Sequence, residues 1–332
     1  MSPFFSLIVP VYNGGAPFQR CIRAIAQSTF TDWELIVVDD GSVDGSAEIA
    51  RPIATHILST AGHEGPAAAR NWGALQATGN YLFFIDADCE VHPDTLARAH
   101  QILVANPQLD ALFGSYDDQP TEPNFASQYK NLCHHFVHQT SDPNATTFWT
   151  GCGCVRRERF LDLGGFDAQR YPRPCIEDIE FGYRLTAAGG TIRLAKDVQV
   201  KHLKRWTTYS MLRSDIFDRA LPWTELLLTR DSAETNLNLR WQNRLSVILI
   251  FLTVPLTLYR NSRSRLPFLL LALLGLNWQL YQFFYLKRGL LFTMRAILYH
   301  WLYYGYSGAV FGVGFGRKIL ELFLNSFDNS CE

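Results

Sequence analysis

The sequence lacks the charge imbalance and the basic N-terminal region that would place it in several large protein classes. Its 332 residues carry 30 Lys and Arg against 31 Asp and Glu, so the formal net charge is −1. A nearly neutral chain has no broad basic surface for a polyanion, so nucleic acid is not expected as a partner. The N-terminus has no basic region, and its apolar run from Phe4 to Val11 is short. We therefore predict no signal peptide and a cytoplasmic first domain.

Cysteine is also sparse. The seven cysteines are odd in number and scattered from Cys21 to Cys331, unlike the dense, even framework of a small secreted domain. Cys152 and Cys154 form a CxC pair, but no second pair with zinc-ligand spacing accompanies them. We expect the cysteines to be reduced and mostly buried.

The first hundred residues have the pattern of an α/β domain. Short β-rich runs alternate there with helical patterns, which is typical of βαβ units and a mostly parallel sheet. Predicted strands are Ser6–Val11, Glu34–Val38, His56–Ser59, Tyr81–Ile85 and Ala111–Ser115, and predicted helices are Phe18–Gln27, Ser42–Ala50 and Gly65–Thr78. Such sheets bind ligands at the carboxyl ends of their strands.

Beyond Asp117 the pattern loosens before it becomes regular again. His134, His135 and His138 have a spacing that could suit a metal site, but no nearby acid completes a ligand set, so we favour a partly solvated helix. Further on we predict helices at Arg157–Leu163 and Glu177–Ala188 and strands near Thr191–Leu194 and Val198–His202.

The apolar excess of the chain follows Arg244. Leu266–Leu286 and Ala296–Gly316 are long runs without Asp, Glu, Lys or Arg, each sufficient for the roughly 20 residues that cross a bilayer. Leu245–Tyr259 is shorter and is either a short span or an interfacial segment. If this segment does not cross, the arginines that follow it stay on the cytoplasmic side, as the positive-inside rule prefers. We therefore predict two spans rather than three.

A third region lies between these two. From Trp206 to Arg230, apolar residues recur at helical spacing among arginines, which suits helices on a bilayer surface; an amphipathic helix packed on the first domain is the alternative. The predicted domains are thus 1–205 (catalytic), 206–240 (interfacial helices) and 241–332 (membrane region). The whole is expected to be a multi-pass protein of the cell inner membrane with its catalytic domain in the cytoplasm.

The strongest chemical signal is a pair of carboxylates after a buried strand. Asp86 and Asp88 follow Tyr81–Ile85, and their spacing directs both side chains the same way. At a strand end such a pair can hold a hard divalent cation, whose remaining positions take diphosphate oxygens. A lone DxD is a weak signal, but the strand before it favours this interpretation over a pair of solvated turn aspartates.

Two further acidic groups occupy similar positions. Asp39 and Asp40 end a strand, where their oxygens could accept a hydrogen bond from a base N–H or a ribose hydroxyl. Glu177 and Asp178 begin a helix, where acids complement the helix dipole. Capping explains one acid there; three acids in four residues leave one that could deprotonate an acceptor hydroxyl as general base.

Four motifs together give the chain a resemblance to family 2 glycosyltransferases of the membrane-anchored bacterial type. They are Ile8-Val9-Pro10-Val11-Tyr12-Asn13, Val38-Asp39-Asp40-Gly41-Ser42 with Asp44, Gly65-Pro66-Ala67-Ala68-Ala69-Arg70-Asn71 leading to Asp86-Ala87-Asp88, and Gly164-Gly165-Phe166-Asp167 leading to Glu177-Asp178. Their order and spacing cover about Phe4 to His202. The resemblance implies the GT-A fold, an α/β nucleotide-sugar-binding fold with a mixed, mostly parallel sheet.

The resemblance implies a role for each matched residue. In similar enzymes the nucleotide pocket would be lined by Pro10, Tyr12, Asn13, Asp39, Asp40, Arg70 and Asp86. The metal, Mg²⁺ or Mn²⁺, would be held by Asp88 with Asp86 and His202. Asp178, beside Glu177, would be the catalytic base of an inverting transfer from a UDP- or GDP-sugar.

Other residues and segments bear on the acceptor and on the number of sugars transferred. Arg205-Trp206 is present without a glutamine three residues before it, unlike the polymerising members, so transfer of a single sugar is expected. The membrane region suggests a lipid or lipid-linked acceptor, with a polyprenyl phosphate as one candidate. A non-catalytic sugar-nucleotide-binding membrane subunit is the rival, but both Asp88 and Asp178 are present. A nucleotidyltransferase is disfavoured because the glycines after Tyr12 form too short a loop for phosphate.

Overall fold

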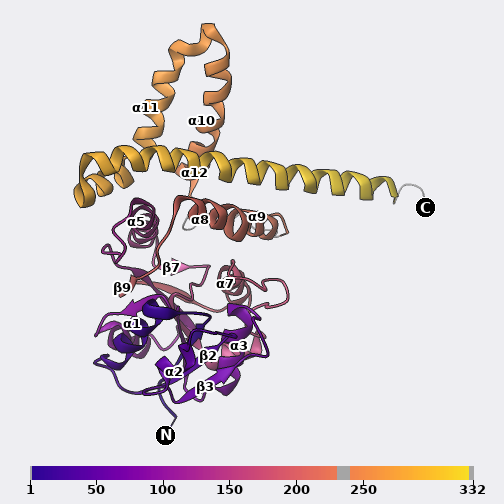
Figure 1. Ribbon diagram of the computed structural model, residues 1–332. Coiled ribbons are helices and arrows are strands. Elements are labelled where there is room, and N and C mark those ends of the chain that lie inside the picture. The colour runs from indigo at the N-terminus through magenta and orange to yellow at the C-terminus, as the bar shows by residue number, and fades with distance from the viewer. Residues whose placement is uncertain (1, 230–239, 329–332) are drawn as a thin grey trace. The chain divides into compact units, whose positions relative to one another are not determined.

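The computed structural model describes residues 2–229 and 240–328, and for residues 260–262 and 322–328 the backbone alone. Arg230 and Cys331 lie outside these residues. The chain divides into two compact units, Met1–Thr207 and Thr208–Glu332 (Figure 1). The acidic motifs all belong to the first unit.

One half of the first unit's sheet is parallel. Strands β3 (His56–Ser59), β2 (Trp33–Asp39), β1 (Phe5–Val11) and β4 (Tyr81–Ile85) lie in that order and run in one direction. All seven residues of β1 and all five of β4 are buried. Helices cover both faces of such strands, which explains why they appear in the sequence as continuous apolar runs.

The other half of the sheet contains antiparallel strands, so the whole is a mixed sheet, as the resemblance implied. Strand β8 (Cys152–Arg156) runs antiparallel between β4 and β6 (Ala111–Tyr116), and β6 then pairs in parallel with β9 (Ile192–His202). Strands β5 (Cys89–Val91) and β7 (Asn144–Ala145) pair antiparallel with β9. The two strands predicted near Thr191–Leu194 and Val198–His202 form one long strand, β9. Its first part pairs with β7 and its last part with β5.

Helices surround this sheet, and their apolar faces form the core with it. They are α1 (Gly15–Ala26), α2 (Ser46–Ala50), α3 (Pro66–Gln76), α4 (Thr95–Ala105), α5 (Phe125–Thr140), α6 (Arg157–Asp162) and α7 (Glu177–Ala187). In α1 the buried residues Phe18, Cys21, Ile22 and Ile25 recur at the spacing of one helical face. Four cysteines of this unit, Cys21, Cys89, Cys152 and Cys154, are buried free thiols.

The second unit is helical. It consists of α8 (Thr208–Arg213), a π-helical segment (Ser214–Ala220), α9 (Leu221–Leu228), α10 (Trp241–Leu258), a 3₁₀ segment (Arg260–Arg265), α11 (Leu266–Leu276) and α12 (Trp278–Asp328). Within α12 the backbone leaves helical geometry at Gly289, whose φ is 79°. This break divides α12 into a short first part and a long second part.

The segment Leu266–Leu286, predicted as one transmembrane helix, is interrupted in its middle, between α11 and α12. The chain bends by 70° at Asn277, between the segments Arg263–Leu276 and Trp278–Glu321. By length and composition, α10 is the one helix among residues 2–229 and 240–328 that could cross a membrane alone, and the bent pair would be a second candidate. The sequence interpretation counted uncharged residues as apolar, although Asn277, Gln279 and Gln282 are polar.

A buried carboxylate on β2 joins that strand to β1 and to the loop between α3 and β4. Glu34 of β2 is buried, and its Oε1 accepts hydrogen bonds from Ser6 Oγ (2.6 Å), Thr78 N (2.7 Å) and Thr78 Oγ1 (2.9 Å). Burial alone would raise the pKa of Glu34, but these hydrogen bonds outweigh it and hold the pKa below its usual value. The ionised form is therefore the one that stabilises the fold.

We expect Glu34→Gln to destabilise the protein at neutral pH by about 1–3 kcal/mol, because the neutral amide oxygen is a weaker acceptor for these three donors than the buried carboxylate oxygen. A depressed pKa contributes stability above the unfolded-state value, and this contribution is lost as the pH falls through the folded-state pKa. The melting curves of variant and wild type should thus converge in acid. Thermal unfolding of the detergent-solubilised chain measures this, with exposed Glu158→Gln as the control; equal melting temperatures at pH 7 would contradict it.

Candidate active site

The ends of β1 and β2 are joined by a network of loop hydrogen bonds. Pairing between β1 and β4 stops at Ile8 and Phe84, just before Pro10, which has no N–H to continue it. Asn13 has a left-handed backbone (φ 50°); its N–H donates to Ser42 Oγ (2.9 Å), and its Oδ1 accepts from Val43 N (2.9 Å). The two loops predicted to line a nucleotide pocket are therefore held together.

Asp39 and Asp40 differ in what their oxygens already bind. Asp40 is 3% exposed. Its carboxylate accepts four hydrogen bonds, from Thr60 Oγ1 (2.9 Å), His63 Nδ1 (2.9 Å), Glu64 N (2.9 Å) and Gly65 N (2.8 Å). Asp39 is half-buried and uses Oδ1 to accept from Ser42 N (2.9 Å). Asp40 thus organises the loop before α3, and Asp39 is the acid with an oxygen left for a ligand.

His63 is a site residue that the sequence analysis missed. Its ring stacks on Tyr12, with centroids 3.9 Å apart and an interplanar angle of 21°. Tyr12 is 49% exposed, so the pair presents aromatic surface beside Asp39 and Asp40. No spacing in the sequence marks His63, because its contacts depend on the loop that Asp40 folds.

Arg70 is the residue that joins the acidic groups. It lies on α3 and is 4% exposed. Its Nη2 donates to Asp86 Oδ1 (2.7 Å) and its Nη1 to Glu177 Oε1 (2.8 Å). Burial alone would lower the pKa of Arg70, but Asp86, Glu177 and Asp178 outweigh it and raise the pKa. A charged guanidinium therefore holds the end of β4 and the start of α7 at one place.

Two close backbone approaches make this arrangement possible. Gly65, at φ 93°, lies so near Pro172 O that a Cβ would collide with this carbonyl, and its N–H donates to Asp40. Gly182 of α7 lies against the backbone of Thr147 and Phe148 in the same way. Only glycine allows both contacts, which bring α7 and the loop before it close to the sheet.

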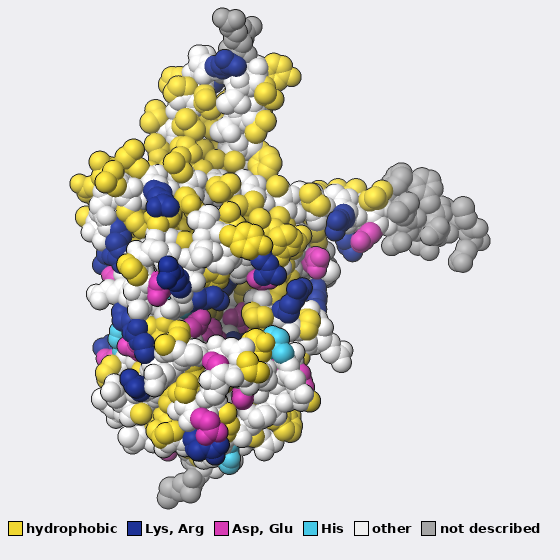
Figure 2. Space-filling model, viewed as in Figure 1, with side chains coloured by type: hydrophobic (Ala, Val, Ile, Leu, Met, Phe, Trp, Pro, Cys, Tyr) yellow, Lys and Arg dark blue, Asp and Glu magenta, His cyan; other side chains and the backbone are white. Residues whose placement is uncertain are grey.

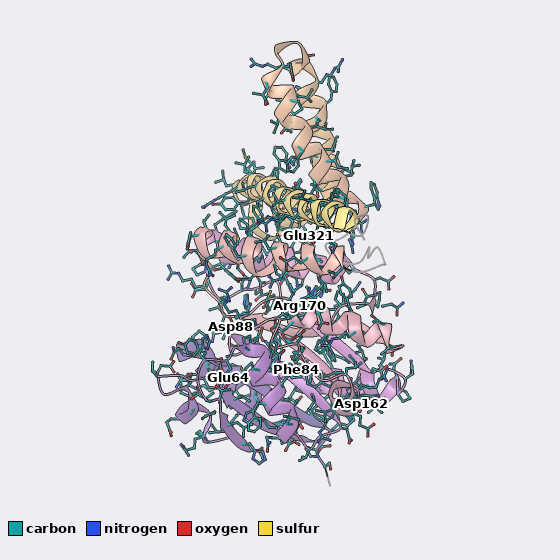
Figure 3. The ribbon with its side chains drawn as sticks, turned by 90° about the vertical axis from the view of Figure 1, so that its right-hand side faces the viewer. Glu64, Phe84, Asp88, Asp162, Arg170 and Glu321 are labelled. Atoms are coloured by element: carbon teal, nitrogen blue, oxygen red, sulfur yellow. The ribbon has the colours of Figure 1, made fainter. Side chains whose placement is uncertain are left out.

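Asp88 is the centre of the candidate metal site. Oxygens of Asp86 and Asp88 and the sulfur of Cys89 lie within 4.8 Å of one another. Burial raises the pKa of Asp88, and Lys204 and Arg70 partly offset this effect. Burial also raises the pKa of the Cys89 thiol, so Cys89 stays protonated and is a poor ligand for a hard cation. Figure 3 shows the chain from Phe84, inside the sheet, to Asp88.

His202 approaches Asp88 from β9. Its Nε2 is 3.9 Å from Asp88 Oδ2, and its ring stacks on Tyr116 at 4.2 Å. The ring of Trp149 packs edge-on against Tyr116, with centroids 4.8 Å apart. His134, which the sequence offered as a weak metal candidate, packs against Tyr116 and Trp149 as part of this aromatic cluster.

Asp178 is oriented by groups on two sides. Its Oδ1 accepts from Ile179 N (2.8 Å), in the first turn of α7, where the helix dipole favours a negative charge. Its Oδ2 accepts from Thr150 N (3.2 Å) and Thr150 Oγ1 (3.3 Å), just before β8. The sequence analysis did not identify Thr150 as a partner, since residues 28 apart gave no signal.

Comparison with known proteins places part of the first unit in a described family. Residues 6–164 match the family described as glycosyl transferase family 2. The chain is 31% identical over 206 residues to glycosyltransferase AglE of Haloferax volcanii, covering 59% of this chain and 66% of that protein. It is 30% identical over 150 residues to a PGL/p-HBAD biosynthesis glycosyltransferase of Mycobacterium tuberculosis, covering 41% and 59%. The chain thus spans less than two thirds of these relatives.

Two solved structures share the fold. The mannosyltransferase PcManGT from Pyrobaculum calidifontis, in complex with GDP-Man and Mn²⁺, aligns with a TM-score of 0.56 at 19% identity, over 84% of this chain and 88% of that one. TarS 1–349 of S. aureus in complex with UDP-GlcNAc aligns with a TM-score of 0.53 at 18% identity, over 94% and 91%. At these identities the likeness establishes a GT-A-like α/β fold.

We expect Arg70→Lys to weaken nucleotide binding at least about tenfold. A lysine cannot donate to both carboxylates from one planar group, and a hydrogen bond between charged groups contributes about 1.5–3 kcal/mol. Calorimetric titration of the solubilised chain with UDP and with GDP, each with Mn²⁺, measures this. The matched control is Arg51→Lys. Arg51 follows α2 directly and forms an exposed ion pair with Glu48 of that helix. Unchanged affinity in both variants would show that Arg70 does not organise the pocket.

Proposed function

We propose that this chain, which carries a family 2 glycosyltransferase domain over residues 6–164, transfers a single sugar from a nucleotide-sugar donor to a lipid-linked acceptor, with inversion and with a divalent metal. The contact between Arg70 and both Asp86 and Glu177 carries the proposal. It holds the acids after β4 beside the acids of α7, so metal, donor and base share one site.

The nucleotide of the donor is proposed to bind over the ends of β1 and β2. Tyr12 supplies an exposed aromatic surface, and Asp39 retains an acceptor for a base or ribose hydrogen. Asn13 and Asp40 are proposed to hold the loops of this pocket in place, because their side chains already form hydrogen bonds to neighbouring loop residues. Pocket shape decides between UDP- and GDP-sugars.

The residues of the candidate metal site fit Mg²⁺ or Mn²⁺. Asp88 and the second oxygen of Asp86 provide the hard donors that both ions prefer, and the imidazole of His202 is a further ligand candidate. When bound, such an ion supplies positive charge where the departing nucleoside diphosphate develops negative charge. Lys204, which acts electrostatically on Asp88, would add to that field.

Asp178 is the proposed general base. Thr150 and the α7 N-terminus fix its carboxylate, so the oxygens cannot turn away from an acceptor hydroxyl. The acceptor oxygen loses its proton to Asp178 as it attacks the anomeric carbon from the side opposite the diphosphate. One displacement of this kind inverts the configuration, and no covalent enzyme intermediate forms.

The acceptor is proposed to be lipid-linked because the second unit carries extensive exposed apolar surface. Helix α10 is long and apolar enough to cross a bilayer, and α11 and α12 also expose large apolar side chains. A catalytic domain attached to a bilayer meets acceptors at headgroup level. The cytoplasmic face is the proposed side.

We expect Asp178→Asn to reduce kcat about 100-fold or more with little change in the donor KM, because general-base catalysis contributes roughly 10²–10⁴-fold. The assay follows nucleoside diphosphate release over a panel of nucleotide sugars, with lipid extract as the acceptor source. The control is Asp162→Asn, which changes an exposed acid at the end of α6. If Asp178→Asn kept full activity, another residue would be the base; if no donor were turned over or bound, the proposed function would be wrong.

The metal site can be tested without turnover. We expect Asp88→Asn to abolish Mn²⁺ binding, measured as free Mn²⁺ by electron paramagnetic resonance, since the amide loses the negative charge that a hard cation requires. Asp94→Asn, an exposed acid paired with Arg98, should bind Mn²⁺ like the wild type. Equal binding by Asp88→Asn would place the metal elsewhere.

A further inference from the structure

The turn before β8 holds Asp178 through one residue, Thr150. This residue donates to Asp178 Oδ2 from its N–H (3.2 Å) and from its Oγ1 (3.3 Å). Both distances are near the upper end of the hydrogen-bond range, so a small displacement of Thr150 would break both bonds. Any group that fixes Thr150 therefore also fixes the proposed general base.

The segment that leads to Thr150 is anchored in the core of the first unit. Phe148 is buried and packs edge-on against Phe84 of β4 and Phe181 of α7, at centroid distances of 6.3 Å and 5.8 Å. A Cβ on Gly182 of α7 would collide with Phe148 N, so the helix and this segment are in direct backbone contact. Between this anchor and Thr150 lies one residue, Trp149.

The indole of Trp149 folds over the residue that follows Thr150. A Cβ on Gly151 would collide with Cζ2 and Cε2 of the indole, and a Cβ on Gly153 would collide with Trp149 O. Glycine is needed at both positions because the ring and the carbonyl occupy the space of a side chain. The two neighbours of Thr150 are thus in contact with each other, which restricts the turn on which Thr150 lies.

The same indole rests on aromatic side chains that reach the candidate metal site. Trp149 packs edge-on against Tyr116 and His138, with centroids 4.8 Å and 5.4 Å apart. Tyr116 in turn stacks on His202, whose Nε2 is 3.9 Å from Asp88 Oδ2. One ring system therefore contacts both the turn that carries Thr150 and a side chain next to the metal site.

The metal side of this cluster has restraints of its own. Tyr116 O lies 2.7 Å from His135 Nδ1 of α5, and His202 pairs with Cys89 across β9 and β5. These contacts persist without the indole. Loss of the indole should therefore displace Thr150 more than it displaces the metal site.

We propose that Trp149 is a positioning residue, whose indole holds Thr150 where it fixes the carboxylate of Asp178. This inference rests on the proposed function, in which Asp178 is the general base. Trp149 takes no part in proton transfer itself. A misplaced Asp178 accepts the acceptor proton less efficiently, whereas the donor and the metal bind to other residues.

Two substitutions displace the indole by different routes. Trp149→Leu deletes it, whereas Gly151→Ala keeps it and places a methyl group where its atoms lie. The control for the first is Trp33→Leu, because Trp33 is also partly buried against the core but lies at the start of β2. The control for the second is Gly275→Ala, since a Cβ on Gly275 meets open space.

We expect Trp149→Leu and Gly151→Ala each to lower kcat about tenfold or more, because a small misplacement of a reacting group is costly. The donor KM and the affinity for Mn²⁺ should stay within about twofold of the wild type, and both controls should keep the wild-type kcat. Release of nucleoside diphosphate measures kcat and KM, and electron paramagnetic resonance of free Mn²⁺ measures metal binding.

The decisive measurement repeats both substitutions in the Asp178→Asn background. A residue that acts through Asp178 has nothing left to position there, so we expect neither Trp149→Leu nor Gly151→Ala to lower kcat further by more than about twofold. A residue that only stabilises the fold would lower it by the same factor in both backgrounds.

Three outcomes would overturn the proposal: a full further loss in the Asp178→Asn background, a wild-type kcat in either folded variant, or loss of Mn²⁺ binding in both. Gly151→Ala, which keeps every native side chain, is the deciding variant if Trp149→Leu does not fold. Failure of the proposed function would look different, since the wild type would then turn over no donor or Asp178→Asn would keep full activity. In that case the role of Trp149 would be wrong as well.

Discussion

A buried guanidinium that binds two carboxylates is the interaction on which the candidate site depends. Arg70 is almost fully withdrawn from water, so its charge must be balanced inside the protein, and Asp86 and Glu177 do this from opposite elements. The site is therefore assembled by charge balance between α3, the end of β4 and the start of α7.

The polar residues around this contact differ in whether their hydrogen bonds are already used. Asp40 accepts four internal hydrogen bonds and shapes a loop, whereas Asp39, one residue earlier, keeps an oxygen for a ligand. Asp178 is oriented by Thr150 and its own helix. Residues saturated by internal partners thus hold in place those that the proposed function assigns to substrate binding.

The second unit uses buried polar groups in a different way. The Tyr304 hydroxyl of α12 lies within hydrogen-bond distance of Asn243 on α10 and of Asn277 at the end of α11, so it links both helices to α12. Helices α10, α11 and α12 expose large apolar side chains, among them Leu258, Phe268 and Leu291. Figure 2 shows hydrophobic side chains over α10 and α11.

The sequence by itself determined the α/β architecture of the first unit and the positions of its parallel strands, because strands buried on both faces need continuous apolar runs. It also identified the acids at strand ends, since that placement follows from the local pattern. Only the tertiary structure decided that β8 runs antiparallel, that Asp40 is saturated and that His63 and Thr150 complete the site. These depend on contacts between residues far apart in sequence. The 70° bend at Asn277 was likewise invisible, because an uncharged run does not show whether its polar side chains find partners in other helices.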